Sequence, residues 1–406
     1  MCIGKIPWTN HHPVFYTMLM DGVIKLTSFT GSLTVAMAVF AFLQMLLFAM
    51  TLGYILIWIR RHLQSNRWIT PAAFIFFALN PVMAMYSVYL TKDVLFSCAL
   101  VLFALKLRDY VAVRDKKELI SIAIWATLVM LLRNNGLMII AIAFLVVIIV
   151  CRTNWREILI ALLIPFVVFG GFRLVAYKVL NIAPQSFAES ASIPLQQTGY
   201  VISSYDIDEL GISDTDINTL KNIMPFEKVK EVYQLGYTDP LKFDEEFNDK
   251  YLNEHSGEYM SAWLHMLPTH LSDYVKAYLA QTAGYWHYGE SNTLCTQGVT
   301  DNELGIEATD VIRNITGISL SGIIEKMMLL LRKAPLLCIL TSMAMQFYML
   351  LLLIVNYVRK KKKAYMNGVF EVTDKSITTE GEQKLFMDGA DAAKMKGKRI
   401  LLLDDI

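Results

Sequence analysis

The sequence lacks the signals of several common protein classes. Its formal net charge is only +1, and no basic stripe is interleaved with aromatic residues, so the pattern that predicts nucleic-acid binding is missing. Its five cysteines have no spacing typical of a metal site or a disulfide framework. Residues 1–21 contain neither a basic n-region nor an apolar h-region, so we predict no signal peptide. These absences argue against nucleic-acid-binding proteins, cysteine metal centres and disulfide-stapled secreted domains.

Charge is also missing from long stretches of the chain, and those stretches are strongly apolar. A run of about 18 or more apolar residues predicts a transmembrane helix. We therefore predict a mainly α, polytopic helical membrane protein with about seven spans, the shorter of them extended by flanking residues. The expected spans are residues 33–59, 70–89, 94–107, 119–132, 137–150, 158–177 and 335–358.

The basic residues give an orientation. They cluster after the first, third, fifth and seventh apolar runs, and cytoplasmic loops carry an excess of Lys and Arg. We therefore expect a multi-pass protein of the bacterial plasma membrane, with its basic C-terminal end and tail in the cytoplasm. Residues 1–32, the junction at 92–93, the turn at 133–134 and the long polar stretch 181–325 then fall on the outer side.

Five segments follow from this pattern. Residues 1–32 form an outer segment whose helix, 14–26, is too short and too charged to span, so we expect it to lie in the membrane interface. Residues 33–178 form a six-span core. Residues 179–330 form an outer loop domain, with helical periodicity at 244–281. Residues 331–363 contain the last span and a basic end, and 364–406 are a short α/β tail with a strand expected near 376–379.

Polar groups gather on the predicted outer face. The adjacent residues Lys92 and Asp93 separate two apolar runs, and an ionisable pair at such a junction is a hairpin tip or part of a site. Arg and Lys are natural partners of phosphate, His can donate to it, and a carboxylate can act as a general base or hold a divalent metal. The predicted topology places these groups on one side of the membrane: His11, His12, Lys92, Asp93, Arg133 and Asn134.

Simpler interpretations remain open for each of these residues. Lys92 and Asp93 also fit a self-compensating charge pair at a helix hairpin, and Arg133 also fits a snorkelling helix end. The two histidines fit an exposed loop, and Asp21 fits a solvated helix face. The aromatic cluster Tyr285, Trp286 and His287 is also typical of packing or interface anchors.

Several strings resemble the C-type glycosyltransferases, multi-pass enzymes that use polyprenyl-phosphate or polyprenyl-diphosphate sugars. TNHHPVFYTML (residues 9–19) is similar to the segment that opens a jaw helix on the outer face of that family, with Val14 in place of a second proline. YLTKDVLFS (89–97) resembles the second outer-loop motif. LLRNNGL (131–137) and AGYWHYGE (283–290) resemble elements of uncharacterised bacterial members. The resemblance covers about residues 6–363.

The resemblance implies a function. A sugar would pass from a polyprenyl-linked donor, a membrane lipid, to an unknown glycan or protein acceptor at the outer face. Lys92, Arg133, His11 and His12 would hold the lipid phosphate, and Asp93 would deprotonate the acceptor or bind a divalent metal. The resemblance also points to Asn134, Tyr285 and Trp286 as substrate-loop residues.

This sequence also departs from the family pattern. The family's usual catalytic aspartate lies upstream of the His-Pro motif, where the residues before Pro13 contain no Asp or Glu. Asp93 is therefore the remaining carboxylate, and we expect an incomplete fragment of such an enzyme.

The tail resembles a different family. DKSITTEGEQKLFMDGADAAKMKGKRILLLDDI (residues 374–406) is similar to part of a purine-type phosphoribosyltransferase, a likeness that implies ribose contacts for Asp404 and Asp405. In that family a phosphate-cradling loop follows the paired acids, so we expect a vestigial site here. Two partial reading frames joined near residues 360–365 would account for both resemblances.

Two alternative functions remain. A non-catalytic transporter or flippase would place ionisable residues in mid-span and show an internal repeat, and the sequence shows no repeat. A phosphoribosyltransferase fragment fused to a membrane protein is the other alternative.

Overall fold

The computed structural model describes residues 8–62, 67–150, 155–287 and 342–367, together with 306, 311–319, 322–323, 326–327, 329–330, 371–373, 376–378 and 384–386. The chain divides into two compact units. Residues 1–283 and 292–341 belong to the first, and residues 284–291 and 342–406 to the second. The fold is mainly helical, as the sequence predicts.

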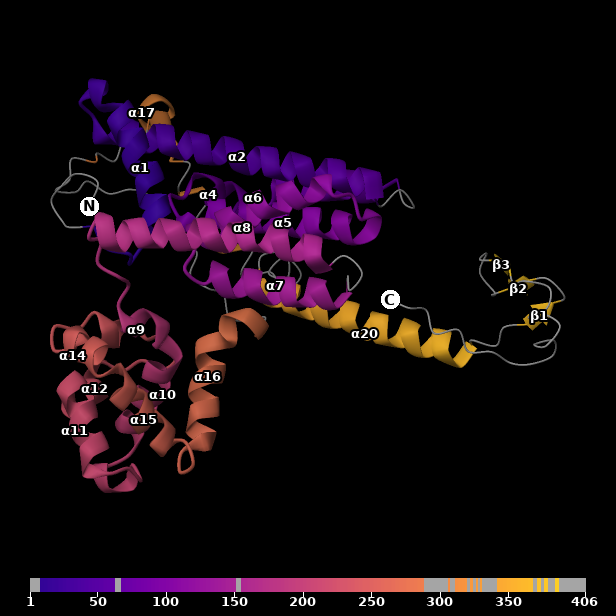
Figure 1. Ribbon diagram of the computed structural model, residues 1–406. Coiled ribbons are helices and arrows are strands. Elements are labelled where there is room, and N and C mark those ends of the chain that lie inside the picture. Colours follow the sequence, from indigo (N-terminus) through magenta and orange to yellow (C-terminus); the bar gives the residue numbers. More distant parts are fainter. Residues whose placement is uncertain are drawn as a thin grey trace. The chain divides into compact units, whose positions relative to one another are not determined.

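Apolar helices make up the first half of the first unit (Figure 1). Their bounds are α1 Val14–Leu26, α2 Leu33–His62, α3 Ile69–Leu79, α4 Pro81–Val88, α5 Lys92–Val113, α6 Lys117–Leu132, α7 Gly136–Val150 and α8 Trp155–Leu174. A π-helical turn, Val175–Val179, continues α8. Helix α1 has the bounds predicted for the short interfacial helix, and it packs against α2 and α6.

Two helices among the described residues are long and apolar enough to cross a membrane. They are Leu33–His62 and Trp155–Val179, and a bent pair formed by α3 and α4 makes a third candidate if it is one span. Gly136–Ile149 and Met343–Arg359 are shorter apolar helices. The fold is therefore helical with apolar helices of spanning length, and the full set of seven spans stays a prediction.

The second predicted span, residues 70–89, is not one continuous helix. Helices α3 and α4 meet at a break, where their axes are bent by 59°. Pro81 has no backbone N–H and so removes a helical hydrogen bond. Asn80 restarts the helix, because its side chain accepts a hydrogen bond from Val82 N at 2.9 Å. The proline therefore stands in the first turn of a new helix, and the predicted span is broken there.

The third and fourth predicted spans form an antiparallel hairpin, α5 and α6, the most closely packed helix pair of the unit. Flanking residues extend α5 beyond the predicted run 94–107 at both ends, and Thr91 caps its first turn by accepting a hydrogen bond from Asp93 N at 3.3 Å. The hairpin lies in one hydrophobic core with α1, α2, α7 and α8. Residues buried there include Phe40, Phe103, Tyr110, Ala126, Val129, Ile140 and Phe169.

The two ends of these helices differ in charge. At the end where α2 stops and α5 turns into α6, cations pair with acids across helices. Lys106 lies 3.0 Å from Glu118, and Lys116 lies 2.7 Å from Glu157. Asp109 accepts a hydrogen bond from Trp58 Nε1 at 3.0 Å. We call this the basic end; the opposite end, where α5 begins and α6 stops, is called the Asp93 end.

The second half of the first unit consists of polar helices with a core of their own. Their bounds are α9 Phe187–Ser190, α10 Ser192–Ser204, α11 Asp214–Ile223, α12 Phe226–Val232, α13 Asp239–Lys242, α14 Asp249–Glu254, α15 Ser256–Met266 and α16 Leu271–Trp286, whose last residues belong to the second unit. The periodicity predicted at 244–281 corresponds to α14, α15 and most of α16, which are separate helices.

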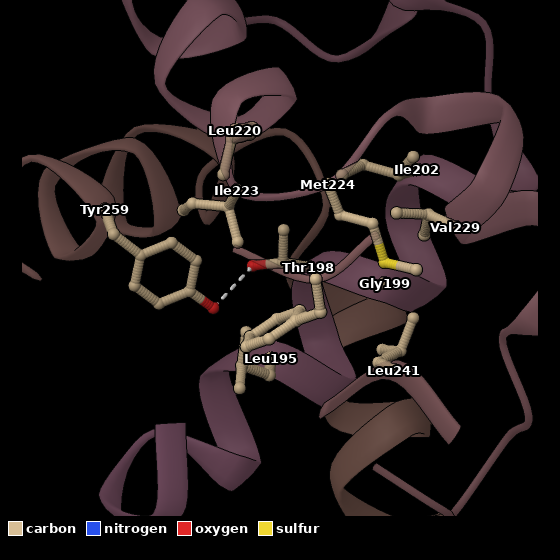
Figure 2. A pocket seen from close by; sticks show the side chains of 11 residues that line it. Leu195, Thr198, Gly199, Ile202, Leu220, Ile223, Met224, Val229, Leu241 and Tyr259 are labelled. Carbon is tan, nitrogen blue, oxygen red and sulfur yellow. Dashed lines mark hydrogen bonds between the residues drawn. The ribbon is translucent and has the colours of Figure 1, made fainter. Parts of the chain in front are cut away.

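A small apolar pocket lies inside this helical domain (Figure 2). Helix α10 lines it with Leu195, Thr198 and Gly199, and Thr198 shares a hydrogen bond of 3.3 Å with Tyr259. A Cβ atom at Gly199 would lie 2.9 Å from Leu241 Cδ1, so side chains pack tightly around it. The pocket is a packing feature of the core, because its lining is aliphatic and aromatic and its hydroxyl groups bond to each other.

The described part of the second unit contains α20, Met343–Asn367, and three short antiparallel strands, β1 Glu371–Thr373, β2 Ser376–Thr378 and β3 Lys384–Phe386. Val372 pairs with Ile377, and Ile377 pairs with Leu385. Strand β2 begins at the predicted strand position. Asp404 and Asp405 lie outside the described residues.

The start of α7 provides a test of this packing. A Cβ atom at Gly136 would lie 2.2 Å from Val129 O, a distance that no real contact allows. We predict that Gly136→Ala lowers the free energy of unfolding by about 1–3 kcal/mol, the usual cost of overpacking. Thermal unfolding of the purified protein in detergent measures this change.

Gly170→Ala is the matched control, because a Cβ atom at that glycine of α8 meets nothing within 4 Å. It should leave the melting temperature unchanged or raise it slightly, since Ala favours helix over Gly. Equal melting temperatures for the two variants would contradict the close approach at Gly136.

Candidate functional site

An ion pair stands at the Asp93 end of the apolar helices. Asp93 lies in the first turn of α5, where the positive end of the helix dipole favours a carboxylate. Arg133 is the first residue beyond α6, with extended backbone geometry that directs it away from the helix axis. Its Nη1 atom lies 3.1 Å from Asp93 Oδ1. The antiparallel packing of α5 against α6 therefore joins two residues that the sequence places 40 positions apart.

The ion pair is open to solutes. The two side chains are 43% and 42% exposed, so a ligand can reach both. The Arg133 guanidinium lies 5.3 Å from the centre of the Phe96 ring, a cation–π contact that limits its orientation. Asp93 Oδ1 itself is buried and makes no hydrogen bond in addition to the ion pair. The arrangement is an accessible cation held against a carboxylate.

Lys92 is a second cation at this end, just ahead of the apolar run that begins at Val94. Burial lowers the pKa of Lys92, and nearby Arg133 also lowers it, whereas Asp93 and Glu189 raise it. Lys92 is thus partly desolvated among charges of both signs. The groups that act on it come from other segments, Arg133 and Glu189, as well as from the adjacent Asp93.

His11 and His12 lie beside these charges, with their ring centres 4.9 Å apart in an edge-to-face contact. Burial lowers the pKa of His12, and the positive charge of Lys92 lowers it further, while Asp93 and Glu189 act in the opposite direction. The lowered pKa of His12 favours the neutral imidazole. It can offer an N–H group to an anion, and it adds no positive charge.

Asn134 takes part in a polar network that ties three segments together. The buried side chain of Asn10 donates to Tyr177 Oη at 2.8 Å and to Asn134 Oδ1 at 3.2 Å. Asn134 in turn donates to Gln185 Oε1. The backbone of Asn10 also donates to Ala183 O at 2.8 Å. Asn134 therefore holds the segment before α1 and the segment before α9 against the Asp93 end.

Arg173 is a residue at this network that the sequence analysis missed, because it lies within an apolar run assigned as a span. Its guanidinium lies 5.5 Å from the Phe169 ring and 5.2 Å from the Tyr177 ring. A small cavity beside it has a polar side, formed by Asn10, Asn134, Arg173 and Tyr177, and an apolar side that includes Met130 and Phe172.

Glu189 is a second carboxylate near the ion pair. It comes from α9, four positions after Gln185, and its charge acts on both His12 and Lys92. It also lies 3.1 Å from Lys242 Nζ. No spacing in the sequence could have found it, because the polar stretch around it has ordinary composition.

Three other predicted residues have surroundings of a different kind. Asp21 is not a solvated residue of a helix face, because it is buried and its Oδ2 lies 2.7 Å from Lys25 Nζ. Tyr285 and Trp286 belong to the second unit, where Tyr285 is exposed and Trp286 O accepts a hydrogen bond from Tyr348 Oη at 2.8 Å.

A divalent metal needs several carboxylate or imidazole ligands close together. Within the described residues, no group of three or more His, Cys, Asp and Glu side chains is arranged to hold a metal ion. Asp93 and Glu189 each have a cationic partner instead, Arg133 and Lys242. The charged groups at this end are thus arranged as pairs of a carboxylate and a cation.

The fold and this site define a class: a helical protein with apolar helices of spanning length and a charged site at their ends. The chain matches DUF6020, a family of unknown function, over residues 5–371, and it belongs to that family. No curated protein and no solved structure matches it. Most of the tail expected at 364–406 lies beyond the matched residues.

The charges at the site predict how His12 titrates. Because the positive charge of Lys92 lowers the pKa of His12, Lys92→Gln should raise that pKa toward the ordinary value of 6.5. The pH dependence of His12 carbethoxylation, followed by peptide mass spectrometry, measures the change.

Lys25→Gln is the control, since Lys25 pairs with Asp21 and is not among the groups that shift His12. Lys25→Gln should leave the pKa of His12 at its wild-type value. An unchanged His12 titration in Lys92→Gln would show that the two side chains do not interact.

Proposed function

We propose that this protein is a membrane glycosyltransferase that moves a sugar from a polyprenyl-phosphate or polyprenyl-diphosphate donor to an acceptor. The observation that carries the proposal is the open ion pair of Arg133 and Asp93, with Lys92 beside it, at the end of apolar helices. A lipid-linked phosphate needs cations at the membrane face, and its acceptor needs a base. The motifs that resemble C-type glycosyltransferases supply three of these residues.

The ion pair supports a simple sequence of events. The donor phosphate binds Lys92 and the Arg133 guanidinium, whose planar fork suits phosphate oxygens. Phosphate competes with Asp93 for Arg133 and displaces its carboxylate. The Oδ1 atom of Asp93 makes no other hydrogen bond, so it is then available as a proton acceptor. Asp93 then accepts the proton of the acceptor hydroxyl.

The reaction conserves atoms and charge. The acceptor oxygen forms a bond to the anomeric carbon as the bond from that carbon to the phosphate oxygen breaks. The bonding electrons and the negative charge go to the phosphate, which remains on the lipid beside Lys92 and Arg133. The configuration of the anomeric carbon is inverted because the acceptor attacks the face opposite the leaving group.

The distribution of charge supports an orientation for this reaction. The basic end carries Arg60, Arg61 and Lys116, and positive charge favours the cytoplasm. The Asp93 end then faces outside, together with the polar helices α9–α16. In this proposal α5, α6 and α7 complete the membrane core with the longer helices, and the chain crosses about seven times.

The break between α3 and α4 favours a second candidate, a lipid flippase, because broken helices are typical of transporters. The charges of the site weigh against it, since Lys92, Asp93 and Arg133 lie at helix ends. Lipid movement across vesicles without cleavage of the sugar–phosphate bond would favour this candidate.

The release of polyprenyl phosphate or diphosphate tests the proposed reaction without knowledge of the acceptor. Membranes that contain the protein are incubated with a panel of synthetic polyprenyl-phosphate and polyprenyl-diphosphate sugars, and the sugar-free lipid is measured by mass spectrometry. Asp93→Asn should slow its release by about 100-fold or more, the usual contribution of a general base. Arg133→Ala should slow it by about 100-fold, as for the loss of an anion-stabilising donor.

Lys116→Ala is the matched control, because it removes an exposed ion pair at the basic end, where such pairs contribute little. Its rate should stay within about twofold of the wild type. Wild-type rates in both Asp93→Asn and Arg133→Ala would overturn the assignment of the site, and a panel in which no donor is consumed would overturn the function.

A further inference from the structure

Gln44 is a polar side chain in the middle of the apolar helix α2. It is only 1% exposed, and it lies far from either end of the helix. Polar side chains are costly among apolar helices and are found there when they make specific contacts. No sequence pattern singles out this residue, because the run 33–59 is otherwise apolar up to its basic end.

The Gln44 amide donates to the backbone of another helix. Its Nε2 atom lies 2.7 Å from Tyr89 O and 3.3 Å from Ser87 O, and both carbonyls are at the C-terminal end of α4. The last carbonyls of a helix have no partner within it. Gln44 therefore caps α4 from a neighbouring helix, and α2 and α4 are packed together.

Hydrogen bonds continue from this cap to the site. Tyr89 O also accepts from Thr91 N at 2.8 Å. Thr91 Oγ1 accepts from Asp93 N at 3.3 Å and donates to Asp93 Oδ2 at 3.3 Å. Asp93 lies 3.1 Å from Arg133. A continuous series of contacts thus joins the buried amide to the ion pair.

The chemistry of the amide supports a specific role. Gln44 Oε1 is buried and has no hydrogen-bond partner, so the amide is not fully satisfied at this position. An apolar side chain of the same length would fill the space without an orphaned oxygen. What only the amide provides is its two N–H groups for two carbonyls.

We propose that Gln44 is a positioning residue that fixes the turn at residues 89–92 and so places Lys92 and Asp93 at the site. Its effect on sugar transfer rests on the proposed function. Its effect on the turn is independent of the proposed function, because Gln44 donates its hydrogen bonds to the backbone of α4 and of Tyr89. Removing the amide frees the turn, which exposes Lys92 and lets Asp93 move away from Arg133.

Thiol labelling of the turn tests this role in the full-length protein. The five native cysteines are replaced by alanine, Lys92→Cys is introduced, and the rate of reaction with a membrane-impermeant maleimide is measured in native membranes. Gln44→Met, of similar length and without the N–H groups, should raise the labelling rate about tenfold, since a tenfold change corresponds to about 1.4 kcal/mol, near the value of one hydrogen bond.

Thr51→Val is the matched control, because Thr51 is a buried polar residue of the same helix whose hydroxyl donates to Leu47 O within α2. Its labelling rate should equal that of the parent. A parent-like rate in Gln44→Met, with the protein folded in the membrane, overturns the proposal.

Gln44→Glu keeps the test decisive if Gln44→Met does not fold. A neutral carboxyl group can donate a hydrogen bond to Tyr89 O, and a carboxylate cannot. The ratio of the Gln44→Glu labelling rate to the parent rate at the same pH should therefore be high at high pH and low at low pH. A ratio that does not depend on pH also overturns the proposal.

The transfer assay separates this inference from the proposed function. With Lys92 intact, Gln44→Met should reduce the release of sugar-free lipid about tenfold, in step with the labelling change. If labelling responds and no donor is consumed by any variant, the role of Gln44 in the turn stands and the glycosyltransferase proposal fails.

Discussion

Much of this structure depends on one constraint: polar groups among apolar helices must find partners. The Asp93–Arg133 ion pair meets it at the surface of the helices, where a carboxylate and a guanidinium neutralise each other. Gln44 meets it inside them, by binding carbonyls that a broken helix leaves free. Each solution joins elements that are separate in the chain, so the polar contacts specify how the apolar helices fit together.

The site has the properties of an exchangeable ion pair. Its carboxylate is held by a helix start and by Thr91, while its guanidinium lies over an aromatic ring and remains accessible. In the proposed reaction an anion takes the place of the carboxylate at Arg133, so the cation is paired before and after the exchange. The same exchange would produce a free base only when the anion is present, which couples binding to reactivity.

Sequence patterns predicted the local features well. The bounds of α1 match the short, charged helix predicted at residues 14–26, and apolar helices of spanning length were expected from hydropathy. The convergence of Lys92, Asp93 and Arg133 was predicted from topology alone. What the sequence could not supply was any contact between distant polar residues: Gln44 and Arg173 sit in apolar runs, and Glu189 comes from a stretch without a motif. The break at Asn80 was also missed, because hydropathy does not register a missing hydrogen bond.

The bridge between Asn10 and Ala183 has a consequence for how the protein is assembled. Asn10 bonds to Asn134 and Tyr177, which lie 124 and 167 positions further along the chain. Synthesis proceeds from the N-terminus, so the segment that carries His11 and His12 gains the last of these partners, Tyr177 and Ala183, only after α8 has been made. The site therefore closes late, after the helices beneath it are in place. Until then the nascent protein has the Asp93–Arg133 ion pair and the turn at residues 89–92, but the contacts of Asn10 with Tyr177 and Ala183 are still missing.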